Sequence, residues 1–522
     1  MTEHIFEAQK QLSPHRRRFR VAFRYQYNIS QQQEEIYSFN HQRCGDWHVH
    51  SGESLPTCRL KDIKGRDIGV LLGIAVGPLG LLCETAPFIP LDSKHPQFWK
   101  KFEEYIIDVA GRYGFLLTRG RQPRMYTDPV GMIGTVFNKE DRYIAASPLL
   151  ALKRPVIQNP KYDPSIVLEK GGKYSIFHTV DAHVKRLMPN HYLDLNTFTE
   201  HRFWPKTEDF IEPEQTRLSL YTDIAARARF NIGAIAAEYE CAMPVSGGQD
   251  SRLLLAFAKP HLHNIEQVYT HINNYSTRID DAVGQALCNA VDKKHESHDR
   301  RVFSMRRWES KLTRALFNAS VGYPSNAPQE YLNGVIKGVK EGSVVLRGHQ
   351  TDILRAVFVF AQKERWEEVD WQLERLRIVP RADFGQDVVD IFADDFKAWQ
   401  ATLPDNAMEK AADFMFLEVY YNSTVGAIFP ALWRNFYVSP FNSRRLIALS
   451  LSFPERVRRK SEPVFDIIHQ IAPELSGIPF DWEIASDIAL MDDKEHVEKI
   501  TKKRTDSTTN RLDDLNGALA PE

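Results

Sequence analysis

Short apolar segments separated by turn residues dominate the first 205 residues of the chain. Such segments occur at positions 21–23, 69–72, 113–117 and 143–146. Segments of this kind predict β-strands. One stretch differs, because Phe98, Phe102, Tyr105 and Ile106 recur at helical spacing and predict a helix over residues 96–109. The pattern therefore predicts a mainly β part of the α+β type that contains one clear helix.

From about residue 215 to residue 490 the pattern changes to an alternation of helical and extended apolar segments. Such an alternation is typical of an α/β domain built on a parallel sheet. Residues 204–209 are polar and read as the linker between the two parts. We therefore expect an α/β protein with one domain at 1–205 and a second at 206–490. Residues 491–522 form a charged tail, poor in aromatic side chains, to which we assign no role.

Composition narrows the class of protein. The chain has 522 residues, 43% hydrophobic and 26% charged, which is typical of a soluble protein with more than one domain. Lys and Arg number 67 against 68 acids, so no net charge favours nucleic acid or an anionic membrane. The five cysteines are few and scattered, and the first residues do not resemble a signal peptide, so we expect free thiols and a cytoplasmic protein. Nothing in the pattern indicates an oligomeric state.

The strongest chemical signal is the segment at 245–252, which reads Val-Ser-Gly-Gly-Gln-Asp-Ser-Arg between two apolar stretches. A strand, a turn of small residues and a helix in this order predict a phosphate-binding loop, because the helix start directs free N–H groups and positive dipole toward the turn. A carboxylate in such a loop suggests Mg²⁺ between it and the phosphates. The alternative is a strand–turn–helix junction capped by serine. The predicted nucleotide-binding residues of this loop are Ser246, Gly247, Gly248, Asp250, Ser251 and Arg252, with Asp250 also a metal ligand.

This loop resembles the pyrophosphate loop of the adenine-nucleotide alpha-hydrolase-like enzymes. Its surroundings are most similar to the synthetase domain of the asparagine synthetase family, which includes the β-lactam synthetases. The resemblance implies that ATP is split between its α and β phosphates to adenylate a substrate carboxylate. Ammonia or an amine then displaces AMP, with ATP and Mg²⁺ as the required small molecules.

The N-terminal part resembles the glutaminase domain of the same family. The matching pieces, in order, lie at 111–115, 128–131, 143–147, 184–194 and 203–205. The family's glutaminase uses an N-terminal cysteine, whereas this sequence begins Met-Thr-Glu-His. We therefore predict a degenerate glutaminase-like domain that does not hydrolyse glutamine.

A second segment, at 344–355, resembles the family signature Ser-Gly-x-Gly-x-Asp-Glu. Gly348 and Asp352 match, while Arg347, Gln350 and Ile353 stand where the family has Ser, Gly and Glu. A strand that ends at residue 346 would put Asp352 at the carboxyl edge of the parallel sheet, where ligands bind. Asp250 and Asp352 are thus predicted to hold Mg²⁺ against ATP, with Gly348 beside the phosphates.

Three further residue assignments are open to two interpretations. His349 stands near the position of the attacking amine by resemblance, so it is either a general base or a hydrogen-bonding structural residue. Lys460 matches a family lysine that stabilises developing negative charge, but its basic neighbours also fit a solvated face. The acids Asp280 and Asp281 are expected to cap the start of a helix rather than to act chemically.

The sequence therefore predicts an ATP-dependent, AMP-forming amide-bond ligase. Its partners would be a small-molecule carboxylate and ammonia or an amine, with no nucleic acid and no membrane. Two alternatives remain: an adenylating enzyme of RNA modification, which the absence of a basic stripe disfavours, and a non-catalytic nucleotide-binding protein.

Overall fold

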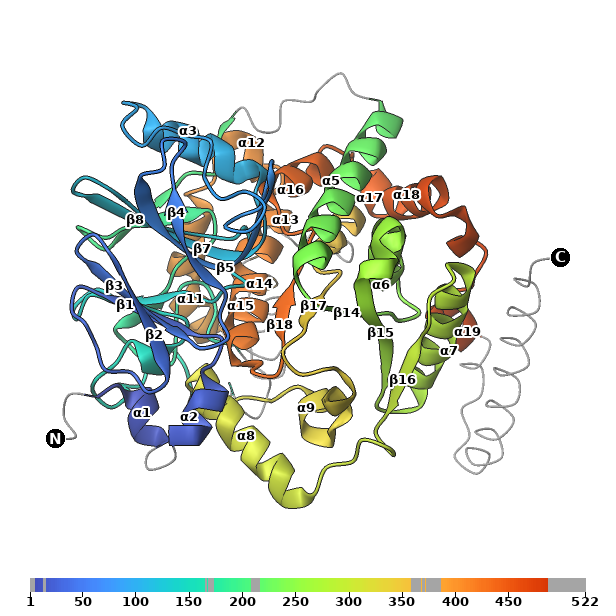
Figure 1. Ribbon diagram of the computed structural model, residues 1–522, viewed down its shortest axis with the longest axis horizontal. Helices are drawn as coiled ribbons and strands as arrows, with labels where there is room; N and C mark the ends of the chain where they lie inside the picture. Colours follow the sequence, from blue (N-terminus) through green and yellow to red (C-terminus); the bar gives the residue numbers. More distant parts are fainter. Residues whose placement is uncertain are drawn as a thin grey trace.

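The computed structural model describes residues 5–12, 16–164, 167, 173–207, 216–357, 368, 371 and 386–486. Within these residues the chain is a mixed α/β protein with two antiparallel sheets and one parallel sheet. In Figure 1 the antiparallel sheets lie on the left and the parallel sheet on the right. The predicted tail at 491–522 and the first four residues lie outside the described residues.

The first antiparallel sheet has the strand order β11-β9-β10-β1-β3-β2, and the second has the order β13-β12-β8-β7-β5-β4 with β6 added beside β5. The strands of the first sheet are β1 (Tyr27–Ser30), β2 (Phe39–Cys44), β3 (Trp47–Gly52), β9 (Val136–Asn138), β10 (Tyr143–Ala145) and β11 (Val184–Arg186). Those of the second are β4 (Thr57–Lys61), β5 (Asp67–Gly77), β6 (Gly80–Leu81), β7 (Ala110–Arg119), β8 (Gln122–Thr127), β12 (His191–Asp194) and β13 (Thr199–Arg202).

Strand β5 explains how the two sheets pack. Its side chains alternate between opposite faces, as a period of two requires. Val70, Leu72 and Ile74 pack into one apolar cluster, with residues of the first sheet such as Ile144. The intervening Leu71 packs into a second cluster that contains the helix α3. Both faces of the strand are thereby buried, which accounts for its nearly uninterrupted apolar sequence.

The helices of this part confirm one prediction and overturn another. The predicted helix at 96–109 is present as α3 (Phe98–Tyr105), followed by η1 (Ile106–Asp108). The apolar segment at 21–23 was predicted to be a strand, but Val21 and Ala22 end the helix α2 (Arg16–Ala22), so that prediction is wrong. A three-residue apolar segment is too short to distinguish the two periods. The remaining elements are α1 (Glu7–Gln11) and η2 (Pro148–Leu150).

Cysteine usage also differs from expectation. Cys58 and Cys83, on neighbouring segments with Cα atoms 6.3 Å apart, form a disulfide. Cys44, Cys241 and Cys288 are free and buried. The expectation of five free thiols is therefore wrong, because spacing along the chain does not reveal which cysteines meet in space.

The parallel sheet has the order β16-β15-β14-β17-β18 in the described part of the chain. Its strands are β14 (Cys241–Pro244), β15 (Ile265–Ile272), β16 (Glu296–Asp299), β17 (Val344–Leu346) and β18 (Phe436–Val438). The predicted second strand at 267–271 and the predicted strand end at Leu346 are confirmed. Strand β14 pairs with β15 on one side and with β17 on the other, so the strand order reverses at β14. At such a reversal the loops after the two strands separate and leave a crevice at the carboxyl edge.

Helices cover the parallel sheet and connect its strands (Figure 1). Those between β13 and β17 are α5 (Arg217–Glu238), α6 (Gln249–Ala258), η4 (Lys259–Asn264), α7 (Tyr275–Ala290), α8 (Arg307–Val321), α9 (Gln329–Asn333) and η5 (Val335–Gly338). Between β17 and β18 lie η6 (Thr351–Arg355), α11 (Gln386–Gln400), α12 (Asp405–Met408), α13 (Ala411–Phe414), η9 (Met415–Tyr420), α14 (Tyr421–Ser423), α15 (Val425–Ile428) and η10 (Phe429–Ala431). After β18 come α16 (Arg444–Leu451), α17 (Glu455–Arg458), α18 (Glu462–Ile471), η11 (Pro473–Leu475) and α19 (Asp481–Ser486).

Buried polar side chains join the β-rich part to the parallel-sheet part. The Arg444 guanidinium donates to Asn190 Oδ1 (2.8 Å) and to the Thr127 carbonyl oxygen (2.8 Å). The Asn442 amide donates to the Gly111 carbonyl oxygen (2.8 Å). Because these groups are buried and paired, the two parts share a dry and specific contact.

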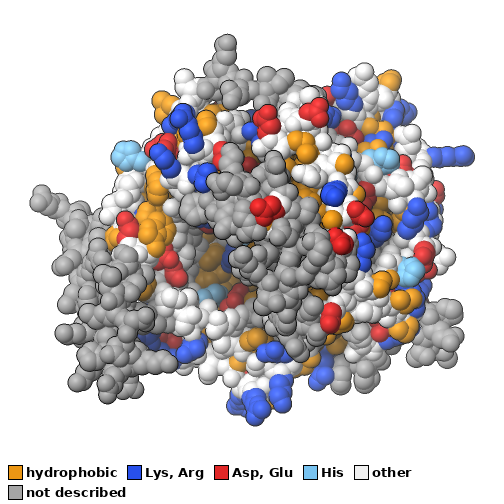
Figure 2. Space-filling model, turned by 180° about the vertical axis from the view of Figure 1, so that it is seen from behind, with side chains coloured by type: hydrophobic (Ala, Val, Ile, Leu, Met, Phe, Trp, Pro, Cys, Tyr) orange, Lys and Arg blue, Asp and Glu red, His pale blue; other side chains and the backbone are white. Residues whose placement is uncertain are grey.

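The surface fits the balanced charge of the sequence. Figure 2 shows basic and acidic side chains interspersed over the described part of one face. Among the described helices, none combines the length and the apolar character that crossing a bilayer requires.

Candidate functional site

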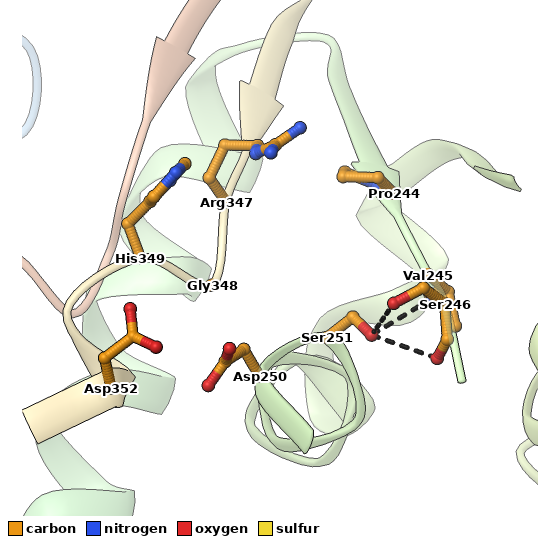
Figure 3. Close-up of a pocket in the computed structure, with 9 residues that line it drawn as sticks. All are labelled: Pro244, Val245, Ser246, Asp250, Ser251, Arg347, Gly348, His349 and Asp352. Carbon is orange, nitrogen blue, oxygen red and sulfur yellow. Dashed lines mark hydrogen bonds between the residues drawn. The ribbon is translucent and has the colours of Figure 1, made fainter. Parts of the chain in front are cut away.

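A cavity of about 270 Å³ lies at the carboxyl edge of the parallel sheet, at the reversal of strand order. Residues that follow β14 line one side of it, and residues that follow β17 line the other (Figure 3). The lining residues are Pro244, Val245, Ser246, Asp250, Ser251, Arg347, Gly348, His349 and Asp352. The structure thus brings the two sequence motifs, a hundred residues apart, to one pocket, because parallel strands end at the same edge.

The loop after β14 is held by its own hydroxyl groups. Ser251 Oγ accepts a hydrogen bond from the Ser246 N–H (3.0 Å) and lies 2.8 Å from Ser246 Oγ (Figure 3). Helix α6 starts directly after this loop, and its N-cap residue, Gly248, supplies no side-chain hydrogen bond. The start of α6, with its N–H groups and positive dipole end, is therefore suited to binding an anion.

Close approach requires glycine at 247 and at 348, whereas Gly248 has neither a close neighbour nor an unusual backbone. Gly248 has φ −82°, a value that any residue adopts. A Cβ atom on Gly247 would lie 2.5 Å from Asp481 Cβ, and one on Gly348 would lie 2.8 Å from the Asp250 carbonyl oxygen. Glycine at 348 thus allows the loop after β17 to touch the start of α6.

The acids Asp280 and Asp281 do not cap their helix, contrary to the prediction. Helix α7 begins at Tyr275 and is capped by Asn274, whose side chain accepts from the Thr277 N–H. Asp280 instead accepts a hydrogen bond from the Gly247 N–H at 2.9 Å. Burial raises the pKa of Asp280, while that hydrogen bond lowers it and the nearby Asp481 raises it further. The first acid of the pair therefore holds the loop after β14 in place.

Asp250 and Asp352 face one another across the pocket (Figure 3). Arg355 Nη2 donates to Asp250 Oδ2 at 2.6 Å and also forms an ion pair with Asp352. Thr351 Oγ1 donates to the other Asp250 oxygen at 3.0 Å. Tyr421 donates its hydroxyl to Asp352 at 2.6 Å. The predicted carboxylate pair thus exists, but an arginine already bridges it.

The two carboxylates of Asp250 and Asp352 have less positive charge beside them than would balance two negative charges. Burial raises the pKa of Asp250, the neighbouring Asp352 raises it further, and Arg355 and Thr351 offset this only in part, so that the pKa stands at about 7. Two carboxylates with hard oxygen atoms on facing elements are suitable ligands for Mg²⁺. Among the described residues, no three His, Cys, Asp or Glu side chains converge to hold a metal by themselves. A metal at this pair would need further oxygen ligands from a bound phosphate or from water.

His349 lies in the pocket wall, with its ring against Tyr421 and Phe429. Burial, together with Arg347, lowers its pKa to about 3, and its Nδ1 atom has no hydrogen-bond partner within the described residues. The imidazole is therefore neutral at pH 7. A pKa this low makes it a weak base, which disfavours general-base catalysis, while the unpartnered Nδ1 atom gives no support to the hydrogen-bonding interpretation.

Gln350 stands where the similar family has the second glycine of the motif, and its backbone shows how the loop accommodates the change. Its backbone is left-handed, with φ 68° and ψ −14°, the region that glycine favours. Its N–H donates to the Tyr421 hydroxyl at 3.2 Å. The loop thus keeps a turn suited to glycine although the residue is glutamine.

Four predicted site residues do not line the pocket, namely Gly247, Gly248, Arg252 and Lys460. Arg252 is buried beneath the loop, and it donates to the carbonyl oxygens of Ile478 (2.5 Å) and Pro479 (2.8 Å). Its predicted contact with phosphate is not compatible with this orientation. The Lys460 side chain is 76% exposed, and its Nζ lies 4.0 Å from the Glu462 carboxylate. Its neighbour Arg458 is the buried member of the basic run and pairs with Asp413 at 2.8 Å.

Sequence reasoning missed three residues of the site. Arg347 lines the pocket, and its positive charge lowers the pKa of the neighbouring His349. Arg355 and Tyr421 bind the carboxylates. Arg347 and Arg355 lie in the segment at 344–355, so their basic side chains could have been recognised from the sequence as candidate site residues. Nothing in the sequence connects Tyr421 to this segment.

Comparison with known proteins adds no family. No protein-family model matches the chain, and a search of curated proteins finds no match. The resemblance to asparagine synthetases therefore stays a prediction from the motifs.

Proposed function

We propose that this protein is an ATP-dependent, AMP-forming amide-bond ligase. It would adenylate a small-molecule carboxylate in the pocket between β14 and β17 and transfer the acyl group to ammonia or an amine. The convergence of Asp250 and Asp352 at the reversal of the sheet is the observation that carries this proposal. A lone glycine-rich loop would support only a phosphate site, whereas paired carboxylates beside it support a metal–nucleotide site.

Each part of the pocket has a role in this chemistry. The uncapped start of α6 and the hydroxyls of Ser246 and Ser251 offer donors to phosphate oxygens. Asp250 and Asp352 would hold Mg²⁺, which when bound neutralises phosphate charge. The side chain of Arg347 is a further cation beside the phosphates. Pockets for whole small ligands span roughly 300–1,000 Å³, so a cavity of about 270 Å³ suits the phosphate portion of a nucleotide better than all of it.

The test is ATP–pyrophosphate exchange with a library of carboxylates. We expect exchange with at least one carboxylate, and its loss in Asp250→Ala and in Asp352→Ala. Asp46→Ala, at an exposed turn between β2 and β3, is the matched control and should exchange normally. Lys460→Gln belongs in the same series: reduced exchange would mean that Lys460 reaches the site during the reaction. Exchange that survives both pocket variants would rule out the metal assignment.

A non-catalytic nucleotide-binding protein is the second candidate, and one observation favours it. Arg355 bridges the two carboxylates that a metal would need. Measuring Mg–ATP affinity beside turnover separates the two functions. Tight binding without exchange for any carboxylate would favour the binding protein.

A further inference from the structure

Arg355 lies at the point where a metal ion shared by Asp250 and Asp352 would bind. A single nitrogen atom of its guanidinium group contacts both carboxylates. Its Nε atom is buried and has no hydrogen-bond partner within the described residues. Within the described residues this side chain makes its polar contacts with the two acids, and not with a carbonyl or a neutral side chain.

Arg355 and a metal ion cannot serve the carboxylates at once. The Arg355 side chain is only 25% exposed and the Asp352 side chain 18%, so the three charged groups interact with little screening by water. A divalent cation that entered between the acids would occupy the guanidinium position and would repel it. The arginine supplies one positive charge to two acids, whereas Mg²⁺ supplies two.

We propose that Arg355 is the counter-ion of the metal-free pocket and that Mg²⁺ displaces it when the nucleotide binds. Arg355 therefore weakens the binding of a divalent cation alone. Phosphate oxygens both add ligands for the metal and attract the released guanidinium. This inference rests on the proposed function, because it takes the pocket to be a metal–nucleotide site.

The experiment measures the binding of Mn²⁺, an oxygen-preferring divalent probe, by the loss of its free paramagnetic signal. The proteins are the wild type and Arg355→Met, which removes the charge and keeps a similar length. Without nucleotide we expect Arg355→Met to bind Mn²⁺ about tenfold more tightly or better, because a like charge at contact distance is removed. With a non-hydrolysable ATP analogue we expect the difference to shrink. Adding Asp352→Asn to Arg355→Met should abolish the gain.

The outcomes separate this inference from the proposed function. Equal Mn²⁺ affinity of the two proteins without nucleotide, with normal binding of Mn²⁺ and analogue together, would overturn the counter-ion role and leave the ligase site standing. If Mn²⁺ binds neither protein even with the analogue, both proposals fall. If Arg355→Met does not fold, Arg355→Lys takes its place, because it keeps one positive charge on a side chain of different reach. A Mn²⁺ affinity of Arg355→Lys above that of the wild type supports the proposal. An unchanged Mn²⁺ affinity overturns it.

Discussion

Two clusters of charge in this protein, one buried and one half-buried, have opposite character. At the contact between the β-rich part and the parallel-sheet part, Glu418 accepts two hydrogen bonds from Arg202, both at 2.7 Å. Asn190 and Trp399 donate to the same carboxylate at 2.8 and 2.9 Å. Burial alone would raise the pKa of Glu418, but Arg202, His191 and the hydrogen bond from Asn190 outweigh it and hold the pKa below its usual range. One acid thus has one cation and a full set of donors.

In the pocket the balance is reversed. Asp250 and Asp352 share a single arginine, and the pKa of Asp250 is raised to about 7 by burial and by its acidic neighbour. The comparison teaches that the number of charges does not distinguish a structural cluster from a functional one. The balanced cluster at Glu418 joins the two parts of the fold, whereas the pocket cluster lacks positive charge, as the proposed metal–nucleotide site requires.

The largest predicted effect comes from unbalancing the structural cluster. Arg202→Met leaves Glu418 buried without a counter-charge, and we expect a loss of about 3–5 kcal/mol in the free energy of unfolding. Urea denaturation followed by fluorescence measures it. The double variant Arg202→Met with Glu418→Gln removes both charges and should recover much of the loss. A single-variant loss below about 1 kcal/mol would mean that the ion pair is not the main polar contact between the two parts.

A smaller effect with a distinctive sign is expected from pH. The folded pKa of Asp250, about 7, lies above its ordinary value of 3.8, so its contribution to stability is complete below about pH 4 and is lost as the pH rises through 7. Between pH 5 and pH 8 the wild type, free of metal and nucleotide, should lose about 1 kcal/mol relative to Asp250→Asn, a figure reduced for partial exposure. Urea titrations at each pH measure the difference.

The same series provides the contrast. The pKa of Glu418 is lowered, so its contribution is present above its ordinary pKa of 4.5 and is lost as the pH falls through the folded value. Glu418→Gln should therefore differ from the wild type most at neutral pH and least in acid. Parallel curves for wild type and Asp250→Asn from pH 5 to pH 8 would mean that the Asp250 carboxylate is not strained by Asp352.

Much of the site geometry could be predicted from the sequence because it depends on topology. Once 245–252 reads as a strand–turn–helix junction and residue 346 ends a parallel strand, Asp250 and Asp352 must lie at one edge. The direction of an individual side chain is different. Arg252 points into the core and Arg355 points toward the two pocket carboxylates, although both are arginines close after a motif aspartate. That choice depends on packing against residues distant in the sequence, which no local pattern contains.

Gln350, whose backbone is left-handed, is the site of the smallest predicted change in the free energy of unfolding. Its buried side-chain amide has no hydrogen-bond partner within the described residues, and its φ of 68° strains a non-glycine residue. Gln350→Gly should remove about 1 kcal/mol of backbone strain and the unpaired amide. The greater freedom of glycine in the unfolded chain and the lost side-chain burial offset part of this gain. We expect a net increase of about 0.5–1 kcal/mol in the free energy of unfolding, measured by urea titration without metal or nucleotide.

Ala356 provides the matched control for that change. It is also left-handed, with φ 48° and ψ 46°, and it lies just after the same motif with a side chain that has no polar atoms. Ala356→Gly therefore reports the backbone contribution alone, and the difference between the two variants isolates the glutamine amide. A Gln350→Gly protein that is less stable than wild type by more than about 1 kcal/mol, with Ala356→Gly unchanged, would mean that the amide has a favourable role. The Gln350 side chain would then stabilise the fold, as the paired groups around Glu418 do, and would not be a source of strain in the pocket.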